Sequence, residues 1–575
     1  MTSDRSPALL PAWPARRALL RAGSTGGLGL LASSLLPAWA EPVSAGLAVV
    51  SGDDIHLRIA RKMTMIDGRH VHAVAINGTV PGPLVRLREG QEVRLTVENA
   101  LTEETSVHWH GMLVPFQMDG VPGISFPGIP AGASFTYRFP VRQSGTYWYH
   151  SHSGLQEQEG HYGPIVIDPA GADPIASDRE HVIVLSDHSP LHPHVIFKRL
   201  KQQTDVFDYQ RQTLAGQLAG RDQKGAERLR WGRMRMSPTD ISDVTGSTYT
   251  FLVNGHGPAD NWTGLFSPGE RVRLRFVNAS AMTIFNVRLP GLAMTVVAAD
   301  GLPVRPVRID EFQLANAETL DVIVVPEDRA YALVAEPIDR SGIGRATLAP
   351  RAGMAPPPLP PRRARPTADM KDMGMDMSGM SMPGMAMPAM DMSMRSAANA
   401  PSVPLNPGVQ TISPMPRDRT GEPGTGLKDA GHKVLTYADL VALERNPDVR
   451  APGRAMTIHL TGNMERYMWS FDGVKLSAVE HPIPFAAGER VRVTLVNDTM
   501  MNHPIHLHGH FFELVTGHGD HAPRKHTVNV APGGTVTFDL TADAVGDWAF
   551  HCHMLYHMHA GMMQVVTVRP QGTTA

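Results

Sequence analysis

The sequence predicts an all-β protein built from three similar β domains. Three ten-residue segments, 90–99, 269–278 and 488–497, share one pattern: a glycine at the start, alternating polar and apolar residues, and an asparagine at the end. Such alternation is typical of a strand with one buried face. Because the pattern returns three times in a chain of 575 residues, it indicates three copies of one domain, each with its own core.

The first forty residues predict an export signal. Arg16 and Arg17 are followed by an apolar run rich in glycine, alanine and leucine, and then by the small-x-small cleavage site Ala38-Trp39-Ala40. The apolar run is broken by glycines and is short for a membrane span, so we expect cleavage and no membrane anchor afterwards. The twin arginine favours export by the Tat route, which predicts a periplasmic protein.

The repeats and the changes in composition predict the domain boundaries. We expect a signal peptide at 1–40, a first domain at 41–172, a second at 173–350, a linker at 351–430 and a third domain at 431–575. Within the second domain, residues 190–245 are rich in Arg, Lys, Gln and Leu and lack strand alternation. A helical insertion is therefore expected in the second domain.

The linker is rich in proline and methionine. Between Met370 and Met394 it holds eleven methionines in twenty-five residues, spaced by Asp, Gly, Ser and Pro. A segment of this composition cannot form a core, so we expect it to be mobile.

Charge and cysteine content exclude some classes of protein. A formal charge of −2 gives no reason to expect nucleic acid as a partner. A single cysteine cannot form a disulfide within the chain, although exported proteins commonly use them. We therefore expect burial and metal binding to stabilise the fold.

The one cysteine, Cys552, lies directly between His551 and His553. In an extended strand these two histidines point to one face and the cysteine to the other, so one strand can serve two metal sites. A thiolate, imidazoles and a weak axial thioether are the ligands of a blue-copper site, and Cys552, His557 and Met562 supply them with one histidine missing. A free cysteine is usually a small buried hydrophobe. Four histidines within nine residues argue against that role here, because imidazoles are costly to bury without partners.

Four H-x-H pairs lie at offsets that match between the outer domains. Two pairs begin nine residues after the asparagines of the first and third repeats, and two lie in the mutually similar segments 145–152 and 546–553. The pairs are His108/His110, His150/His152, His506/His508 and His551/His553. In the second repeat the same offsets give Val287 and Leu289. Since each pair can reach two neighbouring ions, the four pairs predict a metal cluster shared by the first and third domains.

The first domain cannot hold the blue site. At the positions that correspond to Cys552, His557 and Met562 it carries Ser151, Gln156 and His161. In the third domain His503, just before a proline, supplies the missing histidine.

Together these motifs resemble those of the multicopper oxidases, and the resemblance covers all three domains. Residues 231–240, the methionine-rich linker and the Tat-like signal are similar to those of the periplasmic copper-resistance protein A family. The resemblance implies three cupredoxin-like Greek-key β-sandwich domains, with no copper ligands in the second, and four copper ions.

The resemblance also implies a role for each ligand. Type 1 copper would bind His503, Cys552, His557 and Met562, and type 2 copper would bind His108 and His506. The type 3 pair would take His110, His150 and His553 on one ion and His152, His508 and His551 on the other. Cys552 with His551 and His553 would link the two sites, and Asp119 resembles a carboxylate that supplies protons to the cluster. An ordinary turn aspartate before glycine is the alternative for Asp119.

A multicopper oxidase couples one-electron oxidation of a substrate to the four-electron reduction of dioxygen to water. Cu(I) is the expected reductant, in copper resistance, with periplasmic copper-handling proteins as partners. Additional Cu(I) is expected in Met370 to Met394, since thioethers prefer it. A laccase-like oxidase of small phenols and a copper-sequestering protein with secondary oxidase activity are the alternatives. Tyr556 and Thr499 stand where the related copper-efflux oxidase carries acidic residues, which predicts more reliance on the linker than on carboxylates.

Overall fold

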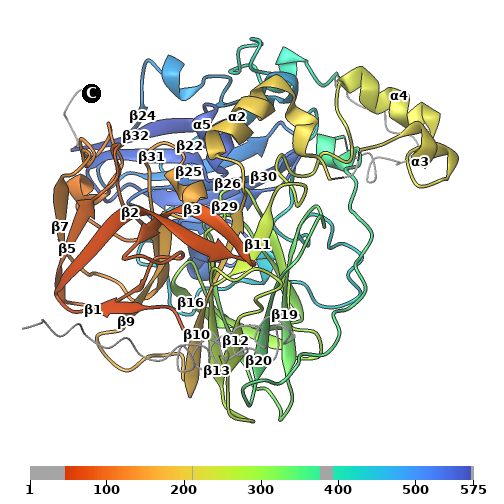
Figure 1. Ribbon diagram of the computed structural model, residues 1–575. Coiled ribbons are helices and arrows are strands. Elements are labelled where there is room, and N and C mark those ends of the chain that lie inside the picture. Colours follow the sequence, from red (N-terminus) through yellow and green to blue (C-terminus); the bar gives the residue numbers. More distant parts are fainter. Residues whose placement is uncertain (1–45, 210, 376–392, 571–575) are drawn as a thin grey trace, which may run out of the picture.

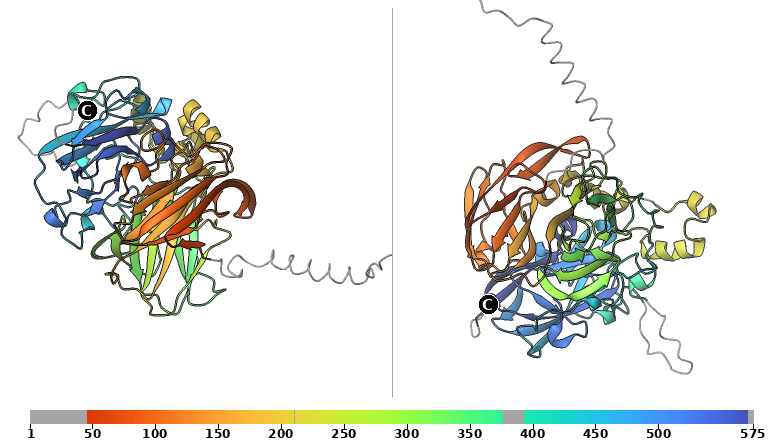
Figure 2. Two further views of the ribbon diagram at one scale, coloured as in Figure 1. Left: turned by 90° about the vertical axis from the view of Figure 1, so that its left-hand side faces the viewer. Right: turned by 90° about the horizontal axis from the view of Figure 1, so that it is seen from below.

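The computed structural model describes residues 46–209, 211–375 and 393–570 (Figure 1). The export signal over 1–40 and most of the methionine-rich segment lie outside the described residues. In the described part of the chain the strands form six sheets, two for each domain. Figure 2 shows the three pairs of sheets, coloured red to orange, yellow to green and blue, grouped around one another. The predicted all-β fold with three sandwich domains is confirmed.

The first domain packs a four-stranded sheet, β3-β2-β5-β7, on a five-stranded sheet, β1-β4-β9-β8-β6. Its strands are β1 (Val49–Ser51), β2 (Asp54–Ile66), β3 (Arg69–Ile76), β4 (Leu84–Arg88), β5 (Glu92–Asn99), β6 (His108–His110), β7 (Ser134–Pro140), β8 (Gly145–His150) and β9 (Tyr162–Asp168), with 3₁₀ turns at Phe116–Met118 and Gln156–Glu159. Aromatic side chains fill the space between the sheets, among them Trp109, Tyr137 and Tyr149.

The second domain packs the six-stranded sheet β11-β10-β13-β18-β15-β16 on the five-stranded sheet β12-β20-β19-β14-β17. Its strands are β10 (Arg179–His188), β11 (Thr250–Val253), β12 (Thr263–Leu265), β13 (Val272–Asn278), β14 (Phe285–Arg288), β15 (Met294–Ala299), β16 (Leu302–Ile309), β17 (Glu311–Leu314), β18 (Thr319–Val324), β19 (Tyr331–Pro337) and β20 (Gly344–Ala349). The expected helices are α2 (Pro193–Gln202), α3 (Leu214–Leu218) and α4 (Gly225–Met234). Figure 1 shows α3 and α4 projecting from the body of the molecule.

The third domain packs the sheet β23-β22-β25-β30-β27-β28, with β21 added on β30, against the sheet β24-β32-β31-β26-β29. Its strands are β21 (Arg417–Asp418), β22 (Arg454–Asn463), β23 (Met468–Phe471), β24 (Ile483–Ala486), β25 (Arg490–Asn497), β26 (His503–Leu507), β27 (Phe512–Leu514), β28 (Arg524–Lys525), β29 (Thr527–Val530), β30 (Gly534–Thr541), β31 (Gly546–Cys552) and β32 (Met563–Arg569), and helix α5 spans Leu555–His559.

The repeated segments form the same strand in each domain. β5, β13 and β25 each pair in parallel with the first long strand of the domain and antiparallel with a later one. The asparagine that ends each strand is buried, and its side-chain amide donates to two or three backbone carbonyls of residues that follow it in the chain. In the third domain one of these acceptors is Met501, so Asn497 fixes the loop that leads to His503.

The described flanks of the methionine-rich segment are packed on the body of the protein. Arg363 pairs with the buried carboxylates of Glu311 and Glu336 in the second domain. Met373 is buried, and β21 extends a sheet of the third domain. Among the described residues, no helix is long and apolar enough to cross a membrane.

Candidate metal centre

The thiolate site is assembled from β26, β31 and α5 of the third domain. The Sγ atom of Cys552 lies 3.6 Å from Nδ1 of His503 and 3.7 Å from Nδ1 of His557. The two Nδ1 atoms are 3.2 Å apart, and all three side chains are fully buried. A sulfur and two ring nitrogens therefore converge on one point, as a blue-copper site requires.

The local fold explains this convergence. β31 ends at Cys552, and the single turn of α5 returns the chain so that His557 faces the cysteine. The backbone of Met562 closes the loop, because its N–H donates to the carbonyl of His557 and its carbonyl accepts from the N–H of Cys552. The Met562 side chain is completely buried in the same hydrophobic core as Cys552. The backbone of the predicted axial ligand is thus hydrogen-bonded to that of Cys552 and His557.

Both imidazoles of the thiolate site have partners on their outer nitrogens. Nε2 of His503 is hydrogen-bonded to Oγ1 of Thr499 at 2.8 Å. Nε2 of His557 donates to a carboxylate oxygen of Asp243 at 2.6 Å, and Asp243 also accepts from the hydroxyl of Tyr467. Asp243 reaches the thiolate site from the second domain. Its side chain is buried, so its charge acts on His557 with little screening.

We predict that Asp243→Asn raises the reduction potential of a copper ion bound at the thiolate site. The carboxylate favours the more positive, oxidised state, and removing its charge withdraws that stabilisation. A rise of about 60 mV corresponds to a tenfold change in the equilibrium of a one-electron couple. Redox titration of the blue absorption measures the change, and an unaltered potential would show that Asp243 serves packing alone.

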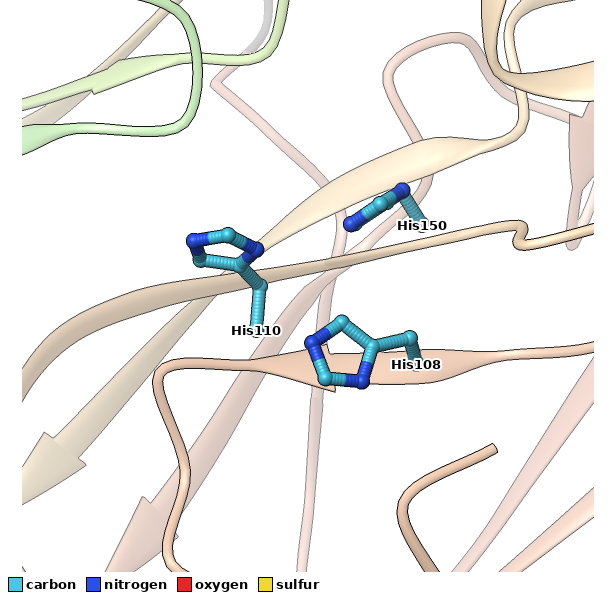
Figure 3. Close-up of side chains that lie close together, drawn as sticks. All are labelled: His108, His110 and His150. Atoms are coloured by element: carbon cyan, nitrogen blue, oxygen red, sulfur yellow. The ribbon is translucent and has the colours of Figure 1, made fainter. Parts of the chain in front are cut away.

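Eight histidines from the first and third domains form a second, larger cluster. Figure 3 shows His108 and His110 on β6 and His150 on β8 with their rings facing one another. Across the domain boundary, Nε2 of His553 lies 3.3 Å from Nε2 of His150. Within the third domain, Nε2 of His508 lies 3.0 Å from Nε2 of His551. The structure therefore brings all four predicted H-x-H pairs together.

Hydrogen bonds on the Nδ1 side orient several of these rings. Nδ1 of His108 donates to the backbone carbonyl of Asp119 at 2.8 Å, and Nδ1 of His508 donates to its carboxylate at 2.9 Å. Asp119 is held in a turn that requires glycine at the next position: Gly120 has a φ of 83°, and a Cβ there would lie 1.9 Å from the carbonyl oxygen of Val107. Asp119 thus orients histidines of two domains, His108 through its backbone carbonyl and His508 through its carboxylate.

Several buried ring nitrogens of the cluster have no hydrogen-bond partner among the residues that the structure describes. They are Nε2 of His108, His152 and His506, and Nδ1 of His110 and His553. Burial and neighbouring imidazoles lower the pKa of His110, His150, His152, His506, His508 and His553, and burial lowers that of His551 to about 4. Neutral imidazoles with unshared lone pairs aimed at one centre are costly unless a metal ion accepts those pairs. The residues therefore fit a copper cluster.

Comparison with known proteins identifies the family. Models described as multicopper oxidase match residues 59–172, 223–352 and 450–572. The chain is a multicopper oxidase. Members of this family use type 1, type 2 and type 3 copper, and the thiolate site and the histidine cluster fit these centres.

Relatives of this multicopper oxidase match it over nearly its whole length. It is 47% identical to the copper resistance protein A homolog of Pseudomonas syringae pv. tomato, over 94% of this chain and 98% of the relative. It is 45% identical to copper resistance protein A of Escherichia coli, over 96% of this chain and 98% of the relative. Fet3p, a multicopper oxidase that functions in iron import, has a similar fold with a TM-score of 0.64 at 18% identity, covering 90% of each chain.

Four residues around the multicopper oxidase centres were not predicted from the sequence: Asp243, Glu157, His526 and Thr527. A carboxyl oxygen of buried Glu157 lies 2.8 Å from Nδ1 of His150, and that Nδ1 is hydrogen-bonded to the carbonyl of Ser151. The ring of His526 lies 4.8 Å from that of His110, and its carbonyl accepts from Nδ1 of His506. None of the four belongs to an H-x-H pair or repeats between domains, so spacing gave no signal for them.

Proposed function

We propose that this multicopper oxidase oxidises Cu(I) to Cu(II) at the type 1 site and acts in copper resistance in the periplasm. Relatives that are 45–47% identical carry the name copper resistance protein A, which supports a role in copper tolerance. The export signal predicted at 1–40 supports a periplasmic location. Dioxygen is the proposed electron acceptor, and periplasmic copper-handling proteins are the proposed partners.

The contact between the methionine-rich segment and the type 1 loop carries the proposal for Cu(I). Farther along the linker, the N–H of Ile412 donates to the carbonyl of Met394 at the end of the segment, and the N–H of Ser413 donates to the carboxylate of Asp498. Asp498 precedes Thr499, whose hydroxyl is bonded to His503. The segment is therefore anchored beside a proposed type 1 ligand.

Methionines also lie next to the proposed type 1 ligands in the sequence, since Met500 and Met501 precede His503 and Met554 follows Cys552. All three are buried in the large hydrophobic core that also contains Cys552, and Met370 and Met394 pack against that core. Neutral thioethers prefer Cu(I) to Cu(II), and methionine adapts its shape to irregular surroundings. Capture of Cu(I) by the segment and its transfer toward His503 fits this arrangement.

The proposed ligands follow the geometry described above. His503, Cys552, His557 and Met562 would hold type 1 copper, and His108 and His506 type 2 copper. One type 3 ion would be held by His110, His150 and His553, and the other by His152, His508 and His551. One donor atom from each of the last three histidines lies within 4.8 Å of the other two. When bound, copper supplies one-electron uptake at the thiolate site and reduction of dioxygen at the histidine cluster.

The chain contributes the link between the two sites and their orientation. Cys552 is bonded through the backbone to His551 and His553, so the thiolate site and the cluster are joined by a short covalent path. Asp119 orients His108 and His508, and its proposed role in proton supply stays a prediction. The described interior around both sites is tightly packed with aromatic and aliphatic side chains, which restricts water there.

Oxygen uptake by copper-loaded protein tests the proposed substrate. With Cu(I) as sole reductant we expect faster uptake than with a simple phenol at equal concentration. Equal rates would contradict selectivity for Cu(I) and support a laccase-like oxidase. Absence of uptake with either reductant, in protein that binds copper, would support sequestration instead.

We predict that deleting Met370 to Met394 slows Cu(I) oxidation at limiting copper by about tenfold, the effect of losing about 1.4 kcal/mol of capture free energy. Oxidation of a phenol should stay the same or improve, because access to the type 1 site opens. A variant with a Gly/Ser segment of equal length controls for spacing and should behave like the deletion. Unchanged Cu(I) kinetics and cellular copper tolerance would show that the segment is only a spacer.

A further inference from the structure

The second domain contributes none of the proposed copper ligands, yet one of its turns reaches the edge of the histidine cluster. Asp300 and Gly301 connect β15 to β16, and both have positive φ, 46° and 80°. Gly301 packs directly on β8 of the first domain: a Cβ on Gly301 would lie 2.3 Å from the ring of Tyr147, and one on Gly145 would lie 2.1 Å from the Gly301 carbonyl oxygen. No larger residue fits at this junction without displacing the strand that ends at His150.

On its other side the turn holds the third domain. Oδ2 of Asp300 accepts from the backbone N–H groups of His526 and Thr527, both at 3.2 Å. Oδ1 lies 3.0 Å from Nζ of Lys525 and accepts from the N–H of Thr319. Asp300 is completely buried, and Lys525 is nearly so. One carboxylate therefore fixes three consecutive residues at the break between β28 and β29.

Those residues contact two of the proposed copper ligands. The carbonyl of His526 accepts from Nδ1 of His506 at 2.7 Å. The hydroxyl of Thr527 lies 3.2 Å from Nδ1 of His506 and is hydrogen-bonded to Nε2 of His110 at 3.2 Å. A displacement of residues 526–527 would therefore rotate the rings of a proposed type 2 and a proposed type 3 ligand.

The energetics favour a geometric role for this contact. A buried ion pair such as Asp300 with Lys525 adds little net stability, because the loss of hydration offsets the attraction. Hydrogen bonds from backbone N–H groups to a carboxylate are short-range and directional, and they are stronger than bonds to a neutral acceptor. Partners of metal-ligating histidines commonly set the orientation of the rings.

We propose that Asp300 is a positioning residue through which the second domain fixes the orientation of His506 and His110. Its carboxylate accepts hydrogen bonds from the N–H groups of residues 526 and 527 and so holds them in place. These two residues in turn hold the imidazoles of His506 and His110. The turn also packs against the first domain, so it sets the distance between the two domains that build the cluster. The proposal concerns assembly of the oxidase centre and does not depend on whether Cu(I) is the substrate.

Two double variants test the proposal with the charge held constant. D300N/K525M removes both charges of the ion pair but keeps an oxygen that can accept from His526 and Thr527. D300A/K525M removes the same charges and that oxygen as well. We expect the alanine variant to show an altered type 2 electron paramagnetic resonance spectrum and about 10- to 100-fold weaker copper binding or turnover. The asparagine variant should have the type 2 spectrum, copper binding and turnover of the wild type. The type 1 absorption should be unchanged in both double variants.

The unfolding temperature of the copper-free proteins separates positioning from loss of fold. D321N is the matched control, because Asp321 is a buried second-domain carboxylate that pairs with Arg273 and contacts Thr146 of the first domain. It should change the unfolding temperature without altering the type 2 spectrum. If D300A/K525M does not fold, D300S/K525M replaces it, since serine is polar but too short to reach both N–H groups. A wild-type spectrum in the alanine or serine variant, or equal loss in the asparagine variant, overturns the proposal.

Discussion

Replacing Cys552 with serine is expected to abolish the intense blue absorption and to stop turnover, while the protein stays folded. The Sγ atom lies within 3.7 Å of both imidazole nitrogens of the thiolate site, and Cys552 is the single cysteine of the chain, so no other residue can supply a thiolate. Burial raises the pKa of the Cys552 thiol, and a metal ion must supply the free energy that makes it a thiolate. A serine hydroxyl cannot be deprotonated in this way and gives no charge-transfer absorption.

The expected loss is specific to one copper. Burying a hydroxyl in place of the thiol costs about 1–3 kcal/mol, which is less than the usual stability of a folded domain. The histidine cluster keeps all its donors, so the variant should bind one copper fewer per chain and retain type 2 and type 3 signals. Met464→Leu is the control, since Met464 is buried in the same core and the swap conserves volume. Substantial oxidase activity in Cys552→Ser would contradict the role of the thiolate site as the point of electron entry.

The parts of the fold that repeat along the chain could be predicted from the sequence. The alternating segments form β5, β13 and β25, and the offsets from their asparagines lead to His108 on β6 and His506 on β26. These features are local, because a half-buried strand imposes a period of two on its own residues. The helices within 190–245 were also predictable, since that segment lacks strand alternation.

The histidine pairs converge even though three of the four are not entirely within a strand. The strands end at His150, Leu507 and Cys552, so the second histidine of these pairs follows the strand. The pairing of β6 with β8 and of β26 with β31 nevertheless aligns the first histidines across each sheet, His108 with His150 and His506 with His551. The H-x-H spacing therefore predicted the cluster for two reasons: the period of a strand, and the register that aligns the first histidines of neighbouring strands.

The outer partners of the ligands could not be predicted, because they depend on how the domains pack. Asp243 lies 314 positions before His557 and approaches it from another domain. Asp300 acts on the cluster through backbone groups of the third domain, and Glu157 reaches His150 from a short 3₁₀ turn. A single carboxylate in a loop has no periodicity, so only the packing of the domains gives it a partner.

Replacing His108 with alanine is expected to stop dioxygen reduction while leaving the type 1 site able to accept electrons. His108 lies at the middle of the cluster: its ring centroid is 3.9 Å from that of His508 and within 5.8 Å of those of His110, His150, His152 and His506. Its Nε2 is one of the buried ring nitrogens that have no hydrogen-bond partner among the described residues. Removing it deletes one of two proposed type 2 ligands, whereas no residue of the thiolate site is altered.

Anaerobic reduction followed by addition of oxygen separates these two effects in His108→Ala. Reductant should bleach the blue absorption as in the wild type, and oxygen should fail to restore it, with turnover reduced more than about a hundredfold, since loss of even an outer partner of a ligand can cost that much. His161→Ala is the matched control, because His161 is another buried first-domain histidine that contacts Thr105 and stands outside the ligand set. The His161→Ala variant should be less stable than the wild type, but oxygen should still restore its blue absorption. If type 1 absorption disappeared in His108→Ala, or if oxygen restored the colour at the wild-type rate, the assignment of His108 to the type 2 site would be wrong.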